Sequence, residues 1–128
     1  MIDRDYFEHV KGRGILATAD SDGRVDAAVY ARPHITEEGH LAFVMNDRLT
    51  HANLQSNPHA AFLFIEEGPG LKGRRFLMTK VREDDDAALI ASLRRRTYPP
   101  GEEERMKPLV AVFFSVDKEL PLVGAGEG

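Results

Sequence analysis

Short apolar segments separated by turn sequences run along most of this 128-residue chain. Such segments, bounded by Gly, Asn, Asp and Pro, are typical of β-strands joined by tight turns. Asp22 and Gly23 lie between two of them and favour a β-hairpin, because glycine adopts positive φ without steric cost. The predicted strands are residues 14–20, 25–35, 41–45, 59–67, 74–81 and 109–116.

Three segments have the features of helices instead. Apolar residues recur at helical spacing in residues 2–10, and Gly12 follows as a stop signal. Residues 50–57 predict a short helix that ends at Pro58. Residues 82–96 begin with acidic side chains and end with arginines, which complements a helix dipole, and they carry an apolar stripe.

This order places the strands in hairpins rather than in strand-helix-strand units. Six strands in a chain of this length favour a small, nearly closed barrel, because closure removes exposed strand edges. We therefore expect one domain over residues 1–128, mainly β with flanking helices, built as a six-stranded antiparallel barrel. Residues 97–108 are expected to form an exposed loop, and residues 120–128 a flexible tail.

Composition narrows the class of protein. The net charge of -4 argues against a general nucleic-acid binder, and no strand interleaves aromatic with basic residues. The chain has no cysteine, which excludes disulfides and thiolate chemistry and suits a reducing compartment. No segment approaches the roughly 20 apolar residues of a membrane span. We expect a cytoplasmic protein without nucleic-acid or membrane partners.

The sequence contains no P-loop, HExxH or GxSxG motif, and its glycine-rich loop GPGLKG at residues 68–73 leads into a predicted strand rather than the helix that a GxGxxG nucleotide site needs. Its five histidines do not form spaced ligand pairs, so no metal site is assigned. No pair of carboxylates stands on one apolar face, which leaves acid–base hydrolysis without support. No side chain is assigned a catalytic role.

The most informative segment is residues 46–58, NDRLTHANLQSNP, which follows a predicted strand directly and opens a helix. Free N–H groups at a helix start, beside the guanidinium of Arg48 and the hydroxyl of Thr50, would suit a phosphate. Ordinary capping by Asn46 or Asp47, with Arg48 in water, is the simpler interpretation. The local sequence alone favours capping.

A resemblance that extends over most of the chain favours the phosphate site over simple capping. Over roughly residues 7–116 the sequence resembles the pyridoxamine 5'-phosphate oxidase-like split-barrel superfamily of flavin-binding proteins. The resemblance is carried by the leading helix, by GILATADSDGRVDAAVYARPH and, most specifically, by GHLAFVMNDRLTHANLQSNPHAAFLF. The chain is closest in size to the small dimeric FMN-binding members. The resemblance thus implies a split barrel, FMN as cofactor, and a homodimer with the flavin between its subunits.

The resemblance also implies which residues meet the flavin. In such proteins the second strand runs along the flavin, the end of the third strand lies beside the ring or ribityl chain, and the following helix start meets the phosphate. An Asn in that helix and a polar residue on the fifth strand complete the set. The matching residues here are Ala28, Val29, Tyr30, Arg32, Val44, Met45, Arg48, Leu49, Thr50, Asn53 and Arg75.

This chain departs from the oxidases at the phosphate. The oxidases carry an Arg-Lys pair where this chain has Leu49 and Thr50, and Arg48 could restore the charge from one residue earlier. The shorter chain and the missing pair argue against oxidation of pyridoxamine phosphate itself. Strands 59–67 and 109–116 are apolar on both faces, a surplus that either a dimer interface or the longer helices would cover.

The implied function is a redox flavoprotein that transfers electrons or hydride through FMN, with a nicotinamide donor or a redox protein as partner. The alternative is a module that binds or stores FMN, a deazaflavin or haem without turnover. In the haem case, His34 or His51 would be the axial ligand.

Overall fold

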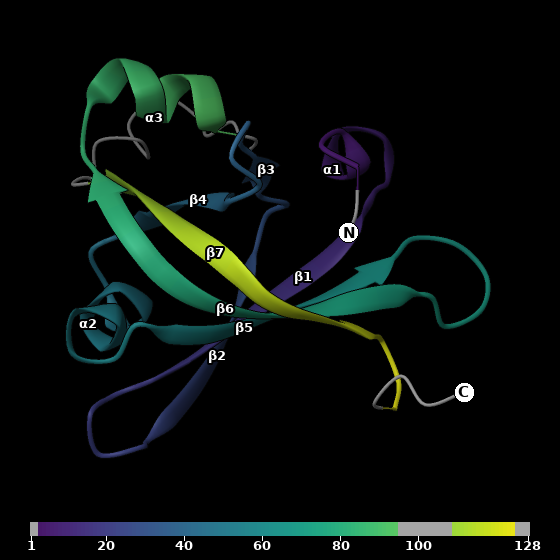
Figure 1. Ribbon diagram of the computed structural model, residues 1–128, viewed down its shortest axis with the longest axis horizontal. Helices are drawn as coiled ribbons and strands as arrows, with labels where there is room; N and C mark the ends of the chain where they lie inside the picture. Colours follow the sequence, from purple (N-terminus) through teal and green to yellow (C-terminus); the bar gives the residue numbers. More distant parts are fainter. Residues whose placement is uncertain (1–2, 95–108, 125–128) are drawn as a thin grey trace.

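The structure is a computed structural model that describes residues 3–94 and 109–124 (Figure 1). The loop predicted for residues 97–108 and the end of the predicted tail lie outside these ranges. The strands are β1 (Gly12–Ala19), β2 (Val25–Tyr30), β3 (His34–Ile35), β4 (Leu41–Asn46), β5 (His59–Glu66), β6 (Gly73–Asp84) and β7 (Leu109–Pro121). The helices are α1 (Tyr6–His9), α2 (Leu49–Ser56) and α3 (Ala87–Leu93).

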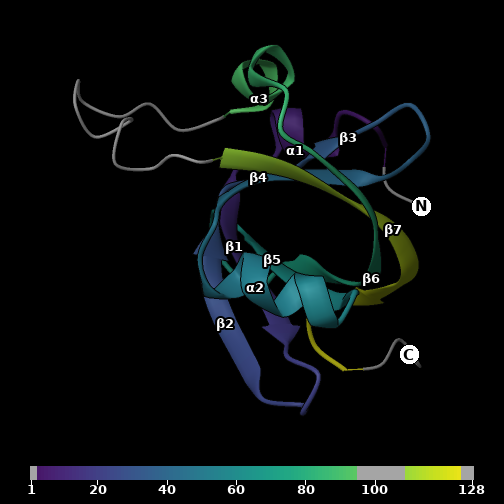
Figure 2. The same cartoon turned by 90° about the vertical axis from the view of Figure 1, so that its left-hand side faces the viewer.

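The described strands form one antiparallel sheet in the order β2-β1-β5-β6-β7-β4-β3. The sheet curls into a half-barrel, with α2 across one of its open ends (Figure 2). Its two end strands, β2 and β3, are consecutive in the chain. The rings of Tyr30 on β2 and Phe43 on β4 meet edge to face across the split, with centroids 6.2 Å apart. The fold is therefore a mainly β, antiparallel half-barrel with helices, as predicted, but with seven strands rather than six.

The additional strand arises because the predicted strand 25–35 is divided. Residues 31–33 belong to neither β2 nor β3. Pro33 lacks the N–H that a continuous ladder would need, and it restricts the residue before it. The division lets the chain leave one end of the sheet and join the other.

Three other boundaries differ from the sequence prediction. β6 continues to Asp84, so the helix predicted for residues 82–96 begins only at Ala87. Asp86 caps that helix by accepting a hydrogen bond from the Leu89 N–H at 2.9 Å. β7 runs to Pro121 instead of ending at residue 116.

The N-terminal helix is a single turn, and Gly12, which was predicted to stop it, lies within β1. Gly14 serves packing there, since a Cβ at this position would lie 2.3 Å from the Phe62 ring. The close approach lets the ring fill the barrel interior.

Two hydrophobic clusters hold the barrel together. The main cluster fills the interior; its fully buried aromatic members are Phe7, Phe43, Phe62, Phe64, Phe76 and Phe114. A smaller cluster lies under α3 and contains Ala42, Ile90, Ala111 and Phe113. Helix α3 therefore covers the second apolar face of the strand predicted at 109–116. Of the two covers expected for this face, a helix or a dimer interface, it is the helix that is found here. The outward apolar side chains of β5 stay half-buried.

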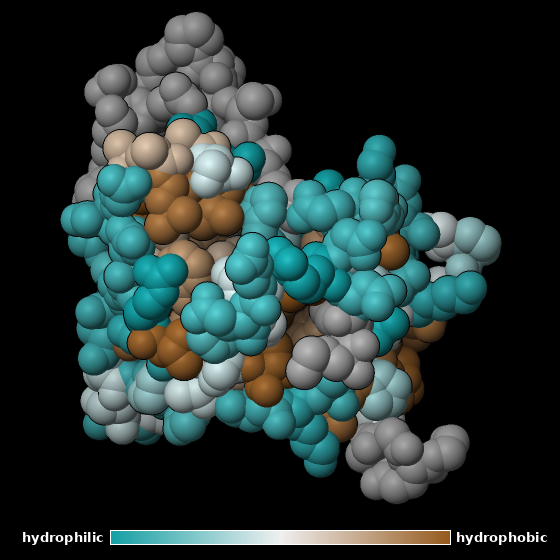
Figure 3. Space-filling model, turned by 45° about the horizontal axis from the view of Figure 1, so that its top comes forward, coloured by the Kyte–Doolittle hydropathy of each residue, from teal (hydrophilic) through white to brown (hydrophobic). Residues whose placement is uncertain are grey.

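Exposed apolar side chains are dispersed on one face of the molecule. When the top of the molecule is brought forward, they form separate patches among hydrophilic ones (Figure 3). None of the helices in the described ranges is long and apolar enough to cross a membrane.

Candidate functional site

A cavity of about 350 Å³ lies in the split between β2 and β4, between the start of α2 and the end of α3. Nine of the eleven predicted flavin contacts line it, namely Ala28, Val29, Tyr30, Arg32, Val44, Met45, Arg48, Leu49 and Thr50. Curling of the sheet brings the two predicted segments together, since β2 is the first strand of the order and β4 is the last but one. Asn53 and Arg75 are outside this lining.

The α2 end of the cavity offers backbone N–H groups. The first helical hydrogen bond runs from the Ala52 N–H to the Arg48 carbonyl at 2.9 Å. The N–H groups of Leu49, Thr50 and His51 precede it, and no side chain in the described ranges caps them. A helix start with free N–H groups favours an anion.

The capping expected from Asn46 or Asp47 does not occur. Oδ1 of Asp47 contacts Nδ1 of His51 at 2.8 Å instead. Oδ1 of Asn46 is buried without a hydrogen-bond partner in the described part of the chain, and Asn46 lines the cavity. A buried acceptor left unpaired costs about 1–3 kcal/mol, so a ligand hydroxyl placed there would be stabilised.

The two predicted arginines have different surroundings. Arg48 is exposed at the cavity and forms no ion pair with a carboxylate of the described ranges. Nη1 of Arg32 donates hydrogen bonds to the carbonyls of Phe7 at 2.6 Å and Val10 at 3.2 Å. Arg32 therefore ties the end of α1 to the barrel and borders the cavity from that position, whereas Arg48 can turn toward a ligand.

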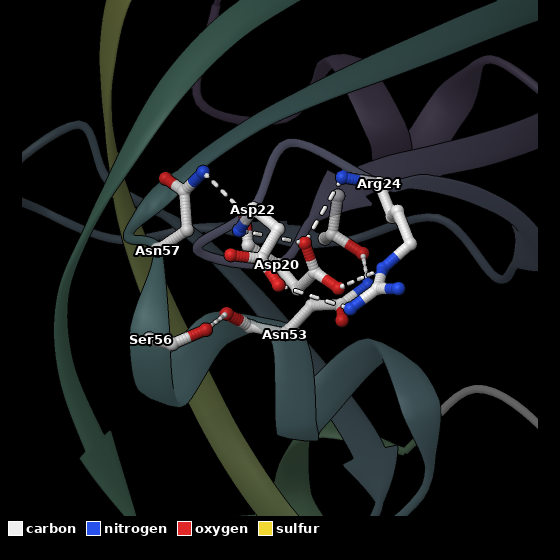
Figure 4. Close-up of polar contacts among 7 residues, drawn as sticks. Asp20, Asp22, Arg24, Asn53, Ser56 and Asn57 are labelled. Atoms are coloured by element: carbon white, nitrogen blue, oxygen red, sulfur yellow. Dashed lines mark hydrogen bonds and ion pairs between the residues drawn. The ribbon is translucent and has the colours of Figure 1, made fainter.

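Polar contacts fix α2 on the β1–β2 hairpin (Figure 4). Nδ2 of Asn53, 5% exposed, donates to Oγ1 of the buried Thr18 at 3.0 Å. Nδ2 of Asn57 donates to the Asp20 carbonyl at 3.5 Å. Asn53 thus lies on the buried side of α2 and anchors this helix to the hairpin.

Replacement of Asn53 by alanine is expected to lower the free energy of unfolding by about 2 kcal/mol, because the buried Thr18 hydroxyl loses its partner. Urea denaturation would measure it. Ser56→Ala removes an exposed hydroxyl from the same helix and is expected to stay within about 0.5 kcal/mol of the parent. Equal losses in the two variants would contradict an anchoring role for Asn53.

Arg75 lies away from the cavity. It belongs to β6, where it pairs with Leu63, and its Nε donates to the Pro121 carbonyl at 2.9 Å. Its guanidinium also contacts the Gly124 carbonyl. Contact between Arg75 and a flavin therefore stays a prediction, because within a single chain Arg75 does not line the cavity.

Some cavity residues were missed by the sequence prediction. The cavity is also lined by Leu93 and Arg94 at the end of α3 and by Leu109 at the start of β7. The two α3 residues reach it because α3 packs on β4. Asp26 also lines the cavity, as an inward neighbour of Ala28 on β2. Alternation along β2 could have indicated Asp26, but no local signal placed α3.

The histidines considered as haem ligands have their ring nitrogens engaged. Nε2 of His34 contacts the Leu93 carbonyl at 2.9 Å, and its Nδ1 lies 3.4 Å from Glu8. His51 lies between Asp47 and Glu83. Haem ligation would have to break these contacts. Within the described ranges no three His, Asp or Glu side chains gather as a metal site.

No family model and no curated protein matches this sequence. Solved structures do. An FMN-binding protein of Syntrophomonas wolfei shows 15% identity and a TM-score of 0.71, over 94% of this chain and 84% of that one. An F420 reductase shows 18% identity and a TM-score of 0.65, over 93% of this chain and 97% of that one.

A third structure, a candidate pyridoxamine 5'-phosphate oxidase of Lactobacillus delbrueckii, shows 15% identity and a TM-score of 0.65, over 94% of this chain and 92% of that one. At these identities the likeness concerns the fold. It extends over nearly the whole chain in all three cases. The chain therefore shares the fold of these three proteins, in agreement with the split barrel that the resemblance in its sequence implies.

Proposed function

We propose that this protein binds FMN in the cavity between β2 and β4 and works as a redox flavoprotein. The observation that carries the proposal is the uncapped start of α2, with Arg48 beside it, at one end of a cavity that also holds the unpaired Asn46 Oδ1. When bound, FMN would accept and pass on electrons or hydride. The protein supplies binding, orientation and access.

The residues fit the parts of FMN in order along the cavity. The phosphate carries up to two negative charges, which the N–H groups of Leu49 and Thr50 and the Arg48 guanidinium would stabilise. The Asn46 amide would accept a hydrogen bond from a ribityl hydroxyl. Tyr30 and Val44 supply apolar surface for the flavin ring. In this arrangement the charged and N–H groups meet the phosphate, the amide meets the ribityl chain, and the apolar side chains meet the ring.

A homodimer would complete the site. The cavity volume is at the lower end of the range for ligand pockets, so one chain leaves part of a flavin uncovered. Val29 and Leu49 border the cavity yet remain 69% and 58% exposed. A second subunit placed over this rim would bury these apolar side chains and the uncovered ligand together.

The outer face of the sheet supports the same proposal. Opposed residues form one outward row of Ala27, Ala17, Ala61 and Leu77, and a second of Val29, Ile15, Leu63 and Arg75, across β2, β1, β5 and β6. Helix α3 packs on β4 and β7 instead, on the other side of the barrel. These mostly apolar rows provide a surface for the second subunit.

The visible spectrum of the purified protein, mixed with FMN, tests the cofactor and the chemistry. We expect a bound flavin spectrum that bleaches with a nicotinamide donor or a reduced redox protein. A bound flavin that no donor reduces would favour storage. Preference for a deazaflavin would instead agree with the likeness to the F420 reductase fold. Failure to bind any flavin would contradict the proposal.

The proposed cytoplasmic location rests on the absence of cysteine in the sequence.

A further inference from the structure

Hydrogen-bonded side chains connect the first turn of α2 to strand β6, and we call the set of Asp47, His51 and Glu83 the link. Nδ1 of His51 lies 2.8 Å from Oδ1 of Asp47, and Nε2 of His51 lies 2.9 Å from Oε1 of Glu83. The other oxygen of Glu83 accepts hydrogen bonds from Gln55 at 2.6 Å and from Lys80 at 2.9 Å. The imidazole is thus held between two carboxylates from different elements.

This geometry selects the charged form of His51. A neutral imidazole has one N–H, so one ring nitrogen would turn a lone pair toward a carboxylate, whereas imidazolium donates to both. Burial alone would lower the pKa of His51, but the hydrogen bonds to Glu83 and Asp47 outweigh burial and raise that pKa. The charged groups around the ring are Asp47, Glu83, Asp84, Asp85 and Lys80.

The link also stabilises the charge on Glu83. Burial opposes ionisation, yet hydrogen bonds from His51, Gln55 and Lys80 lower the pKa of Glu83 to about 2. The carboxylate therefore stays ionised throughout the neutral range. His51, whose pKa is raised above that of an ordinary histidine, is therefore the group whose proton changes these contacts as the pH rises.

Two residues of the link flank the proposed phosphate site in the sequence. Asp47 directly precedes Arg48, and His51 directly follows Thr50. The Asp47–His51 contact therefore closes over residues 48–50, and the His51–Glu83 contact holds this turn against the barrel. Groups that bind a ligand depend on supporting contacts of this kind for their orientation.

We propose that His51 is a positioning residue that holds the α2 turn in shape for the FMN phosphate and makes FMN affinity fall as pH rises. The proposal rests on the proposed FMN site. Below its pKa, His51 is charged and makes both contacts. Above it, one contact is lost, so the loss of affinity falls on the alkaline side.

The experiment compares the affinity of the full chain for FMN and for riboflavin, which has no phosphate, between pH 6.5 and 9. For the parent we expect about tenfold weaker FMN binding at pH 9 than at pH 6.5, and no such change for riboflavin. His51→Gln is expected to bind FMN weakly at both pH values. Glu83→Gln keeps an acceptor but lacks the charge, so its loss of affinity should move to lower pH.

A matched control comes from another His–Asp pair. Nε2 of His9 lies 3.1 Å from Asp5, also four residues away, and both of these side chains at α1 are exposed. His9→Gln is expected to retain the pH profile of the parent. An identical profile in the parent and in His51→Gln would overturn this inference and leave the proposed function intact. Absence of FMN binding by the parent at every pH would overturn both.

Discussion

Joint replacement of Arg48 and Thr50 by alanine is expected to weaken FMN binding about 100-fold. The change removes the guanidinium and the hydroxyl beside the uncapped helix start, and charge-assisted contacts to phosphate are among the strongest hydrogen bonds in proteins. The backbone N–H groups remain, so some affinity should persist. Titration of flavin fluorescence would measure the change.

Two comparisons locate the effect at the phosphate. Riboflavin should bind the double variant and the parent nearly equally, because it has no phosphate to lose. Arg24→Ala removes an exposed guanidinium at the tip of the β1–β2 hairpin and should leave FMN affinity unchanged. Unchanged FMN affinity in the double variant, with the fold intact by circular dichroism, would show that the phosphate binds elsewhere.

Local signals were sufficient for the parts of the fold made by neighbouring residues. Asp22 and Gly23 marked the β1–β2 hairpin, and Gly23 there has a φ of 84°. The strand, turn and helix of residues 41–57 also appear in the structure, because their apolar pattern, helix start and Pro58 lie within one short segment.

Boundaries failed where one local pattern admits two structures. The acidic residues after 82 suit a helix start, but Glu83 and Asp84 pair with β7 as the end of β6. A cross-strand partner decides between these structures, and the sequence of one segment does not contain it. The break at Pro33 had a local signal, which the apolar character of residues 25–35 outweighed.

The candidate site was predictable to the extent that it consists of two segments. The resemblance located β2 and the 44–50 region, and the sheet brings both to one cavity. Site residues that come from other parts of the chain could not be predicted from these two segments. The contact between His51 and Glu83 joins residues 32 apart, and the contribution of Arg94 depends on how α3 packs.

The split in the barrel connects fold and proposed function. A fully closed barrel would fill the space between β2 and β4 with ladder hydrogen bonds and side chains. Here the chain breaks at residues 31–33, and β4 pairs with β3 only through residues 34–35 and 41–42. The remaining edge of β4 faces the cavity, which leaves room at the rim of the sheet for the proposed ligand.

Introducing a charge on the outer sheet face is expected to dissociate the proposed dimer. Leu77 ends the outward row that begins at Ala27, and it is 39% exposed in the single chain. Leu77→Glu should therefore cost the monomer little, whereas an unpaired carboxylate buried in an interface costs several kcal/mol. Leu71→Glu, at the 69% exposed Leu71 between β5 and β6, is a matched control.

Sedimentation with and without FMN would separate the possible results. The parent and Leu71→Glu should sediment as dimers, and Leu77→Glu as a monomer whose FMN affinity is at least about tenfold lower, because the flavin loses the surface of the second subunit. The loss should also extend to riboflavin, since the cover acts on the ring rather than on the phosphate. A monomeric parent that keeps its flavin would contradict the shared site, and a dimeric Leu77→Glu would place the interface on another face of the barrel.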